Sequence, residues 1–416
     1  MMPGSVLALI LCLLMEGHSA APDSKPADAN APIWMSDIVP DLGRVPIRNG
    51  ALLIDKNRAG LAFLNDKQLI VYAVYHKLGE LSSRSSPEET SPFRLNVWVV
   101  DSRSGEINAQ KEWGTREHDS AVQATSGGIL VKTGGLVQLY SPDFTQVRAL
   151  PLTLDANARV LTTVSPSGKT IIVDRLPPKS LNSFHDHFDV LDPNSLTNRY
   201  SWDQSPPLYG RYSISDTGIA TATSDGRTIN FTPFGSPRWQ VLLDGTCLGS
   251  RPTLVTDDLL VTHCKGLTVL AISLGVLYTI PMDVKGTDTV PTKICEPYDG
   301  RLSEKTSVSS ASHMIALSWP ILKIKKHPLT EATTCLAEIR VVGFDLAQRK
   351  QNLTLNVEPV PENDYDFALS PDGSMMAILN DRKVSVYRVP VQSNPVQPKQ
   401  RRDQGVSTVE KHFQKE

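Results

Sequence analysis

The chain has 416 residues, with 42 basic and 44 acidic side chains and a formal net charge of −2. This near balance leaves no surplus of positive charge to attract a nucleic-acid backbone or an anionic membrane surface, so neither is expected as a partner. The length would fill two or three ordinary domains, although a closed repeat architecture can use it as one.

Residues 1–21 are typical of a secretory signal peptide. An apolar run over residues 6–15 is followed by the small residues Ser19, Ala20 and Ala21. The run is well short of the roughly 20 residues that a membrane-spanning helix needs, so we expect no membrane span once the signal is removed. We therefore predict a periplasmic or secreted protein.

Two segments outside the folded body are expected to be flexible. Residues 22–43 form a leader and residues 391–416 a polar tail, because small, polar and proline residues dominate both. The folded body is expected to occupy residues 44–390.

The body consists of short apolar and β-branched segments separated by clusters of Gly, Pro, Asn, Asp and Ser. Such segments are typical of β-strands, and hardly any window has a helical period. Clear examples, in chain order, are residues 68–75, 95–101, 128–133, 259–264 and 383–389. We therefore predict an all-β fold.

A recurring polar turn divides this body into seven units. Its clearest copies are Ser165-Pro166-Ser167-Gly168, Ser215-Asp216-Thr217-Gly218 and Ser370-Pro371-Asp372-Gly373, and looser copies begin at residues 65, 125, 256 and 310. Proline presets φ and glycine tolerates positive φ, so the tetrad is expected to form a β-turn. The copies lie about 51 residues apart on average, which is the period of propeller blades with loop insertions.

A second repeated element is an apolar strand that ends in aspartate before a turn, at Asp101, Asp192 and Asp345. In this respect the sequence resembles the WD40 and YVTN-like propeller families, whose third blade strand commonly ends in this way. The resemblance covers roughly residues 44–390 and is one of pattern, because the Trp-Asp and Gly-His pairs of WD40 blades are missing from these positions. It implies a divergent exported propeller, bacterial in style.

The fold predicted from these repeats is a single β-propeller of about seven blades, each with three or four antiparallel strands. The last blade, over residues 366–390, has only three strands of its own, and the segment 45–55 could supply the fourth. Pairing the two ends of the chain would close the ring and leave no long exposed edge. Six or eight blades remain alternatives.

Four cysteines follow the signal peptide: Cys247, Cys264, Cys295 and Cys335. An even number agrees with an oxidising compartment. We favour disulfides between Cys247 and Cys264 and between Cys295 and Cys335, since each pair would lie within neighbouring hairpins. The alternative is four buried free thiols. A zinc site is not expected, because no two cysteines have the spacing of zinc ligands.

No motif predicts a catalytic residue, a cofactor or a metal ion. Residues 163–170 end like a phosphate-binding Gly-Lys-Thr loop but lead into a predicted strand, not a helix. The pair His185 and His187 has no third ligand fixed by sequence, and His263 and Cys264 would point to opposite faces of a strand. The tryptophans are expected to pack blade against blade.

We expect a non-enzymatic scaffold that binds a protein, peptide or glycan through its blade loops. Two long insertions, residues 77–92 and 281–305, are the first candidates for recognition. The alternatives are a hydrolase or lyase with a site at the channel mouth and a subunit of an envelope assembly. Charged groups converging in a pocket would favour the enzyme, whereas an apolar or aromatic patch would favour binding.

Overall fold

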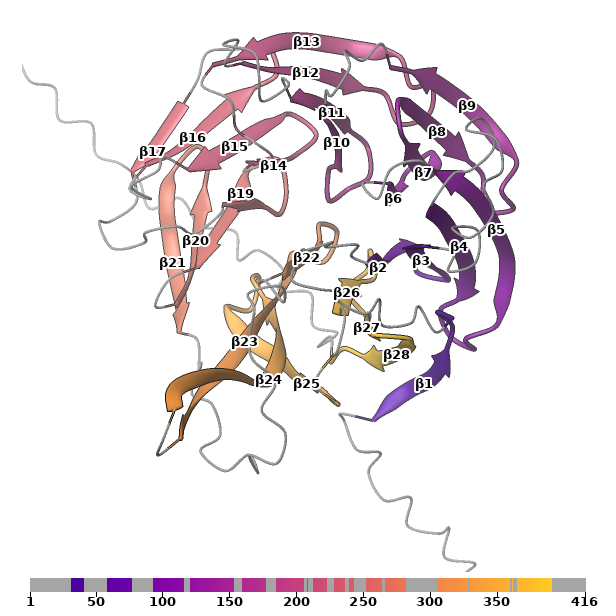
Figure 1. The fold of residues 1–416 in the computed structure, drawn as a ribbon. Helices are drawn as coiled ribbons and strands as arrows, with labels where there is room; N and C mark the ends of the chain where they lie inside the picture. Colours follow the sequence, from indigo (N-terminus) through magenta and orange to yellow (C-terminus); the bar gives the residue numbers. More distant parts are fainter. Residues whose placement is uncertain are drawn as a thin grey trace, which may run out of the picture.

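The protein is a ring of seven four-stranded antiparallel sheets, seen along its central axis in the computed structural model (Figure 1). It is therefore a seven-bladed β-propeller, and both the all-β class and the blade number agree with the prediction. The structure describes residues 31–40, 58–76, 93–115, 120–152, 159–176, 185–205, 208, 212–222, 228–235, 239–242, 252–263, 266–281, 305–327, 330–359, 361 and 365–390. Within these ranges there is no helix long and apolar enough to cross a membrane.

Each blade has four strands, which we call A to D from the centre of the ring outward. Blade 1 contains β2 (Arg58–Asn65), β3 (Gln68–His76), β4 (Phe93–Asp101) and β5 (Ile107–Thr115). Blade 2 contains β6 (Ala121–Thr125), β7 (Gly128–Thr133), β8 (Leu136–Tyr140) and β9 (Gln146–Pro151). Blade 3 contains β10 (Arg159–Val164), β11 (Ile171–Leu176), β12 (Asp186–Leu191) and β13 (Asn198–Gln204).

The next three blades repeat this order. Blade 4 contains β14 (Tyr212–Ile214), β15 (Gly218–Ala222), β16 (Thr228–Pro233) and β17 (Trp239–Leu242). Blade 5 contains β18 (Thr253–Leu254), β19 (Leu259–His263), β20 (Gly266–Ala271) and β21 (Gly275–Pro281). Blade 6 contains β22 (Lys305–Ser309), β23 (Met314–His327), β24 (Thr330–Asp345) and β25 (Lys350–Val357).

Blade 7 joins the two ends of the chain. Its strands A to C are β26 (Tyr365–Leu369), β27 (Met375–Asn380) and β28 (Lys383–Arg388), and strand D is β1 (Pro32–Asp37), antiparallel to β28. Closure of the ring by the terminal strands is thus as predicted.

The strand that closes the ring is not the one expected. It comes from the predicted flexible leader, residues 22–43, whereas the whole segment 45–55 proposed for this role lies outside the described residues. The reason is the apolar content of residues 32–39: the Trp34 indole Nε1 donates to the Ser102 carbonyl at 2.8 Å, and Ile38 and Val39 are buried. The small, polar composition that suggested a leader ends before Pro32.

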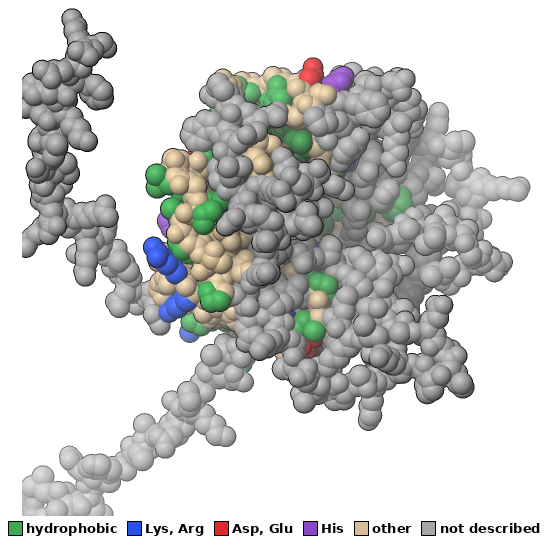
Figure 2. Space-filling model, turned by 90° about the vertical axis from the view of Figure 1, so that its left-hand side faces the viewer, with side chains coloured by type: hydrophobic (Ala, Val, Ile, Leu, Met, Phe, Trp, Pro, Cys, Tyr) green, Lys and Arg blue, Asp and Glu red, His purple; other side chains and the backbone are tan. Residues whose placement is uncertain are grey.

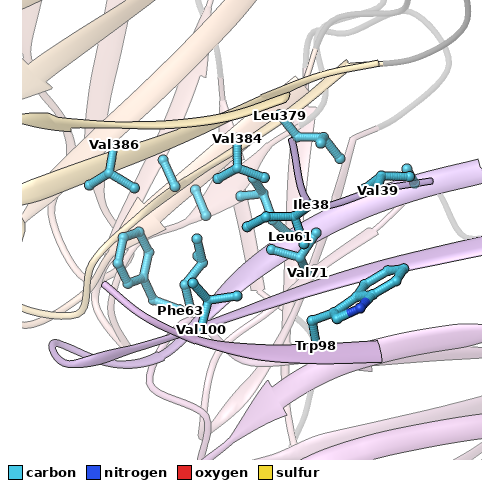
Figure 3. Close-up of a cluster of buried hydrophobic side chains, with 14 of the residues drawn as sticks. Ile38, Val39, Leu61, Phe63, Val71, Trp98, Val100, Leu379, Val384 and Val386 are labelled. Atoms are coloured by element: carbon cyan, nitrogen blue, oxygen red, sulfur yellow. The ribbon is translucent and has the colours of Figure 1, made fainter. Parts of the chain in front are cut away.

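Seven hydrophobic clusters hold the ring together, one between each pair of neighbouring blades. Figure 3 shows the cluster at the closure, where Leu61, Phe63 and Val71 of blade 1 meet Leu379 and Val386 of blade 7. Because every blade packs on both sides, its B and C strands are buried on both faces. This explains why the residues of strands such as β7 are buried in succession and not alternately.

Neighbouring A strands are also joined around the channel by hydrogen bonds from side chains to backbone. The Leu61 amide donates to the Asp366 carboxylate at 3.0 Å, which links blades 7 and 1. Comparable bonds join Gln123 to Thr162, Leu254 to Ser213 and Leu369 to Ser307. The innermost polar residues therefore bind blade to blade.

Candidate interaction surface

The propeller has two different faces. The A–B and C–D turns, all short, lie on one face, which we call the turn face. The strands that flank the B–C and blade-to-blade connections end on the opposite face, which we call the connection face. Both predicted insertions, 77–92 and 281–305, follow strands that end there, but residues 77–92 and 282–304 lie outside the described residues.

The seven polar turns found in the sequence are all A–B turns. In the clearest two, the Gly168 amide donates to the Ser165 carbonyl at 2.8 Å and the Gly373 amide to the Ser370 carbonyl at 2.9 Å, with both glycines at positive φ. The β-turn prediction is confirmed for these two copies, whereas in the third the Ser215 amide donates to the Gly218 carbonyl at 2.9 Å. The strand β11 begins at Ile171, just after Lys169 and Thr170, so the Gly-Lys-Thr segment is a turn between strands.

Aspartates at the second turn position connect one A–B turn to the next. Both Asp216 oxygens accept from the Ser167 hydroxyl of blade 3, and Asp257 accepts from the Asp216 amide at 2.9 Å. Asp66 accepts from the Asp372 amide at 3.0 Å, across the closure between blades 7 and 1. These carboxylates are engaged in holding the ring, so they are structural groups.

The aspartates that end the C strands form the C–D turns, as the repeat indicated. One Asp101 oxygen accepts from the amides of Ser104 and Arg103, at 2.8 and 2.9 Å, and these bonds lower the pKa of Asp101. Asp192 is arranged in the same way. The hydrogen bond from the Asn194 amide is the main reason why the pKa of Asp192 is lowered. Both keep their charge to unusually low pH.

Two open pockets lie on the turn face. One, of about 440 Å³, is lined by Lys169, Asn194, Arg199 and Asp216 among others, and Arg199 is paired with Asp192. The other, of about 480 Å³, lies beside Asp66. Asp66, Asp101, Asp216 and Arg199, which line the two pockets, already have structural partners, so neither pocket gathers a set of reactive groups.

Two carboxyl groups are fully buried between blades 3 and 4. Burial and, after it, the negative charge of Asp186 raise the pKa of Asp174 to about 7, while a hydrogen bond from the Tyr212 hydroxyl acts to lower it. Burial and Asp174 raise the Tyr212 pKa well above its ordinary value. Asp186 accepts from the Leu208 amide at 2.5 Å. This pair lies within a blade interface and lines neither pocket.

The histidine pair of the sequence is divided by the structure. His185 is exposed just before β12, whereas His187 within that strand contacts Asp203 at 2.7 Å and Asp189 at 3.3 Å. Asp189 is also bound by Arg175, Asn198 and Ser201. Among the described residues, no three His, Cys, Asp or Glu side chains are placed to hold a metal ion.

The cysteine prediction falls largely outside the described residues. Cys247, Cys264 and Cys295 lie there, and for Cys335 the backbone alone is described, opposite Lys323 in the β23–β24 hairpin. The disulfides therefore stay a prediction.

Among the tryptophans, Trp98 is buried between blades 7 and 1, and Trp202 stacks on Phe188 with ring centroids 4.9 Å apart. Both pack within the fold.

A β-bulge recurs at the start of the D strand, which the sequence did not reveal. In blade 5, Leu270 pairs with Val276 and Val269 with Tyr278, so Leu277 is extra. The same irregularity leaves one extra, unpaired residue in each of five other D strands. These residues are Ile33, Asn108, Val147, Arg199 and Asn352. Because a bulge twists the edge of a sheet, this position stands at the rim of each of these blades.

The large hydrophobic side chains exposed in the described part of the chain all lie on D strands or their C–D turn. Three of them gather in blade 5: Leu274, Val276 and Leu277, with exposed fractions of 78, 50 and 43 %. We call these three residues the rim patch. Figure 2 views the ring from the side and shows hydrophobic and basic side chains along its left border. The patch could not be found from sequence, because the period of a strand does not tell which apolar residue is exposed.

Comparison with known proteins concerns the fold. No family model matches the chain, and no curated protein matches it. Among solved structures, BamB from Moraxella catarrhalis is 11 % identical, with 79 % of this chain and 84 % of that one covered and a TM-score of 0.37. The Pan2 WD40 domain of Neurospora crassa is 12 % identical, with 81 % and 90 % covered and a TM-score of 0.43. Hsv2 of Kluyveromyces lactis is 10 % identical, with 79 % and 91 % covered and a TM-score of 0.44. These neighbours are β-propellers of the WD40 and BamB type.

Proposed function

We propose that this protein is an exported, non-enzymatic scaffold that binds a partner protein through the rim patch. The observation that carries the proposal is the joint exposure of Leu274, Val276 and Leu277 on one hairpin. Grouped apolar side chains in water commonly mark an interaction site. The hairpin belongs to a blade that packs on both neighbours, so the patch is presented by a rigid support.

The polar groups of the turn face support binding more than catalysis. Asp66, Asp216 and Asp257 accept hydrogen bonds from the preceding blade, and Asp174 and Asp186 are covered by blade 4. A general acid or base needs an ionisable group within reach of a substrate. The first three carboxylates are already engaged in contacts between blades, and Asp174 and Asp186 are buried out of reach of a substrate.

Photo-cross-linking from the rim patch tests the proposal. A photoreactive phenylalanine derivative would replace Leu274 in the full-length protein, made in its own organism, and mass spectrometry would identify any adduct. We expect one partner protein. The matched control replaces Met35, which is 54 % exposed on β1, and should give no adduct. Equal adducts from both positions, or none from Leu274, would contradict the proposal.

Export rests on residues 1–21 and on the even number of cysteines that follow them. Mass spectrometry of the protein purified without reductant tests both. An exported protein should begin near Ala21 or Pro22. It should also be lighter than its fully reduced form by the hydrogens lost in two disulfides. Retention of Met1 together with free thiols would contradict export. If the partner is itself an envelope component, the scaffold is a subunit of an envelope assembly.

A further inference from the structure

The outer strand of blade 5 lacks charged residues, which five of the other six described outer strands contain. A D strand has an open edge that can pair with a foreign strand, and charged side chains on it discourage such pairing. Charged residues occur in each of the other D strands longer than four residues: Lys111 and Glu112 in β5, Arg148 in β9, Arg199 and Asp203 in β13, Lys350 in β25 and Asp37 in β1. The seven residues of β21, GVLYTIP, include none.

The strand is fixed on its inner side and exposed on its outer side. Tyr278 and Ile280 pack into the cluster shared with blade 6, and the Tyr278 hydroxyl donates to the Leu346 carbonyl at 2.5 Å. At the bulge, Val276 and Leu277 together stand opposite Leu270, and both are exposed. In the sheet order, β20 is the partner of β21 among the described strands.

Basic side chains lie beside the turn-face end of this edge. The Arg349 guanidinium is 4.5 Å from the centre of the Tyr278 ring, and Lys350 follows it in the chain. Arg349 is exposed and Lys350 half-buried, and neither has an ion pair with any described residue. A ligand that covers β21 would therefore place its own carboxylate here more favourably than a cation or an apolar group.

We propose that the open edge of β21 binds an extended segment of a partner protein as a fifth strand of blade 5. The segment carries apolar side chains over Val276 and Leu277 and a carboxylate next to Arg349 and Lys350. Main-chain hydrogen bonds would supply affinity, while the apolar and charged contacts would select the segment. This inference rests on the proposed protein-binding function and specifies how the partner is held.

Peptide binding measured by fluorescence anisotropy tests the inference on the full-length protein. The probe is a fluorescein-labelled peptide of alternating valine and threonine with glutamate at both ends. Two further versions are N-methylated at one or the other set of alternate residues, which blocks one hydrogen-bonding edge each. We expect the probe to bind saturably and one N-methylated version, but not the other, to bind at least about tenfold more weakly.

Variants locate the site. Leu277→Lys should weaken probe binding about tenfold or more, whereas the matched change Val147→Lys, at the equivalent bulge of blade 2, should leave it unchanged. A variant with Arg349→Glu and Lys350→Glu should reject the glutamate probe and bind the same peptide ended by lysine. Thermal unfolding of each variant checks that the fold is retained.

Three results would overturn the inference. They are equal affinity of all three peptides, unchanged binding by Leu277→Lys, and a dimer in light scattering that Leu277→Lys dissociates, since the occupant would then be a second copy. If cross-linking from Leu274 still yields a partner in any of these cases, the proposed function stands and the strand-addition mode alone is wrong. Without a cross-linked partner, the proposed function fails, whatever the peptides do.

Discussion

The carboxylate of Asp216 in blade 4 accepts the hydroxyl of Ser167 in blade 3 at 2.7 and 2.6 Å, through its two oxygens. The Ser165 hydroxyl joins the same carboxylate at 2.6 Å. A local turn, which the sequence marks by its Ser-x-x-Gly pattern, is thus also a contact between blades. The ring is held at its turn face by polar bonds and in its interior by apolar clusters.

The first prediction concerns this contact. Asp216→Ala should lower the free energy of unfolding by about 1–3 kcal/mol, because it leaves two hydroxyl groups between blades without their acceptor. Urea denaturation measures the change. Asp143→Ala is the control, since Asp143 accepts only from Ser141 and Thr145 within its own C–D turn, and it should cost less. Equal losses would mean that the contact between blades adds nothing.

The second prediction compares two turn glycines. Gly373 and Gly275 both have positive φ, 71° and 80°. A Cβ at Gly373 would lie 2.2 Å from the Ser312 Oγ, whereas one at Gly275 meets nothing within 4 Å. Gly275→Ala should therefore cost only the backbone strain, about 1 kcal/mol, and Gly373→Ala clearly more.

Thermal unfolding of the two alanine variants tests this comparison, with the wild type as reference. The Gly373 variant should have the lower midpoint temperature. A larger loss for Gly275→Ala would show that the neighbouring blade yields to the added methyl group and that backbone strain decides the cost.

How much of this could be read from sequence depends on the range of each interaction. The A–B turns and the C–D aspartates were predictable, because their bonds run between residues close in the chain, as in Ser370 to Gly373 and Asp101 to Ser104. Repetition of these local signals gave the blade count. The closing strand was placed wrongly because β1 pairs with a strand about 350 residues away, and no local pattern identifies such a partner.

The candidate surface was not predictable at all. Leu277 and Leu270 are both leucines of one hairpin, yet the bulge leaves Leu277 43 % exposed while Leu270 is buried. Which of them is covered depends on blade 4, whose residues are distant in sequence. The same is true of Asp174, which looks like an ordinary surface residue in the strand IIVDRL until Tyr212 and Asp186 enclose it.

The third prediction is a pH dependence that arises from Asp174. Its pKa is about 7 in the folded protein and near 3.8 in the unfolded chain. Between these values the folded state holds a proton that the unfolded state has lost, so the free energy of unfolding falls as pH rises from about 4 to about 7. Asp174→Asn removes this loss and should raise stability at pH 8 by up to about 4 kcal/mol.

Urea denaturation between pH 5 and pH 8 measures the effect of Asp174→Asn. The control is Asp189→Asn, on the opposite face of blade 3, because Asp189 is paired with Arg175 and bonded to Asn198 and Ser201. That change should lower stability at both pH values, since it leaves the half-buried Arg175 guanidinium without its carboxylate. A wild-type stability that is level across this range would contradict the raised pKa of Asp174.

The last prediction concerns closure of the ring by β1. Trp34 lies in the interface between blades 7 and 1, where its side chain packs against the closure cluster, and a Cβ at Gly105 would be 2.9 Å from its ring. Met35, the next residue, points outward and is 54 % exposed. Trp34→Ala should therefore lower the free energy of unfolding by about 2–4 kcal/mol, and Met35→Ala by less than about 0.5 kcal/mol.

Hydrogen exchange separates detachment of β1 from loss of the whole ring. If closure matters to the entire propeller, Trp34→Ala will speed exchange in β28 and also in strands of blade 1, such as β3, that belong to another sheet than β1. Faster exchange in β28 alone would mean that β1 is only a local cover and that the inner strands hold the ring without it.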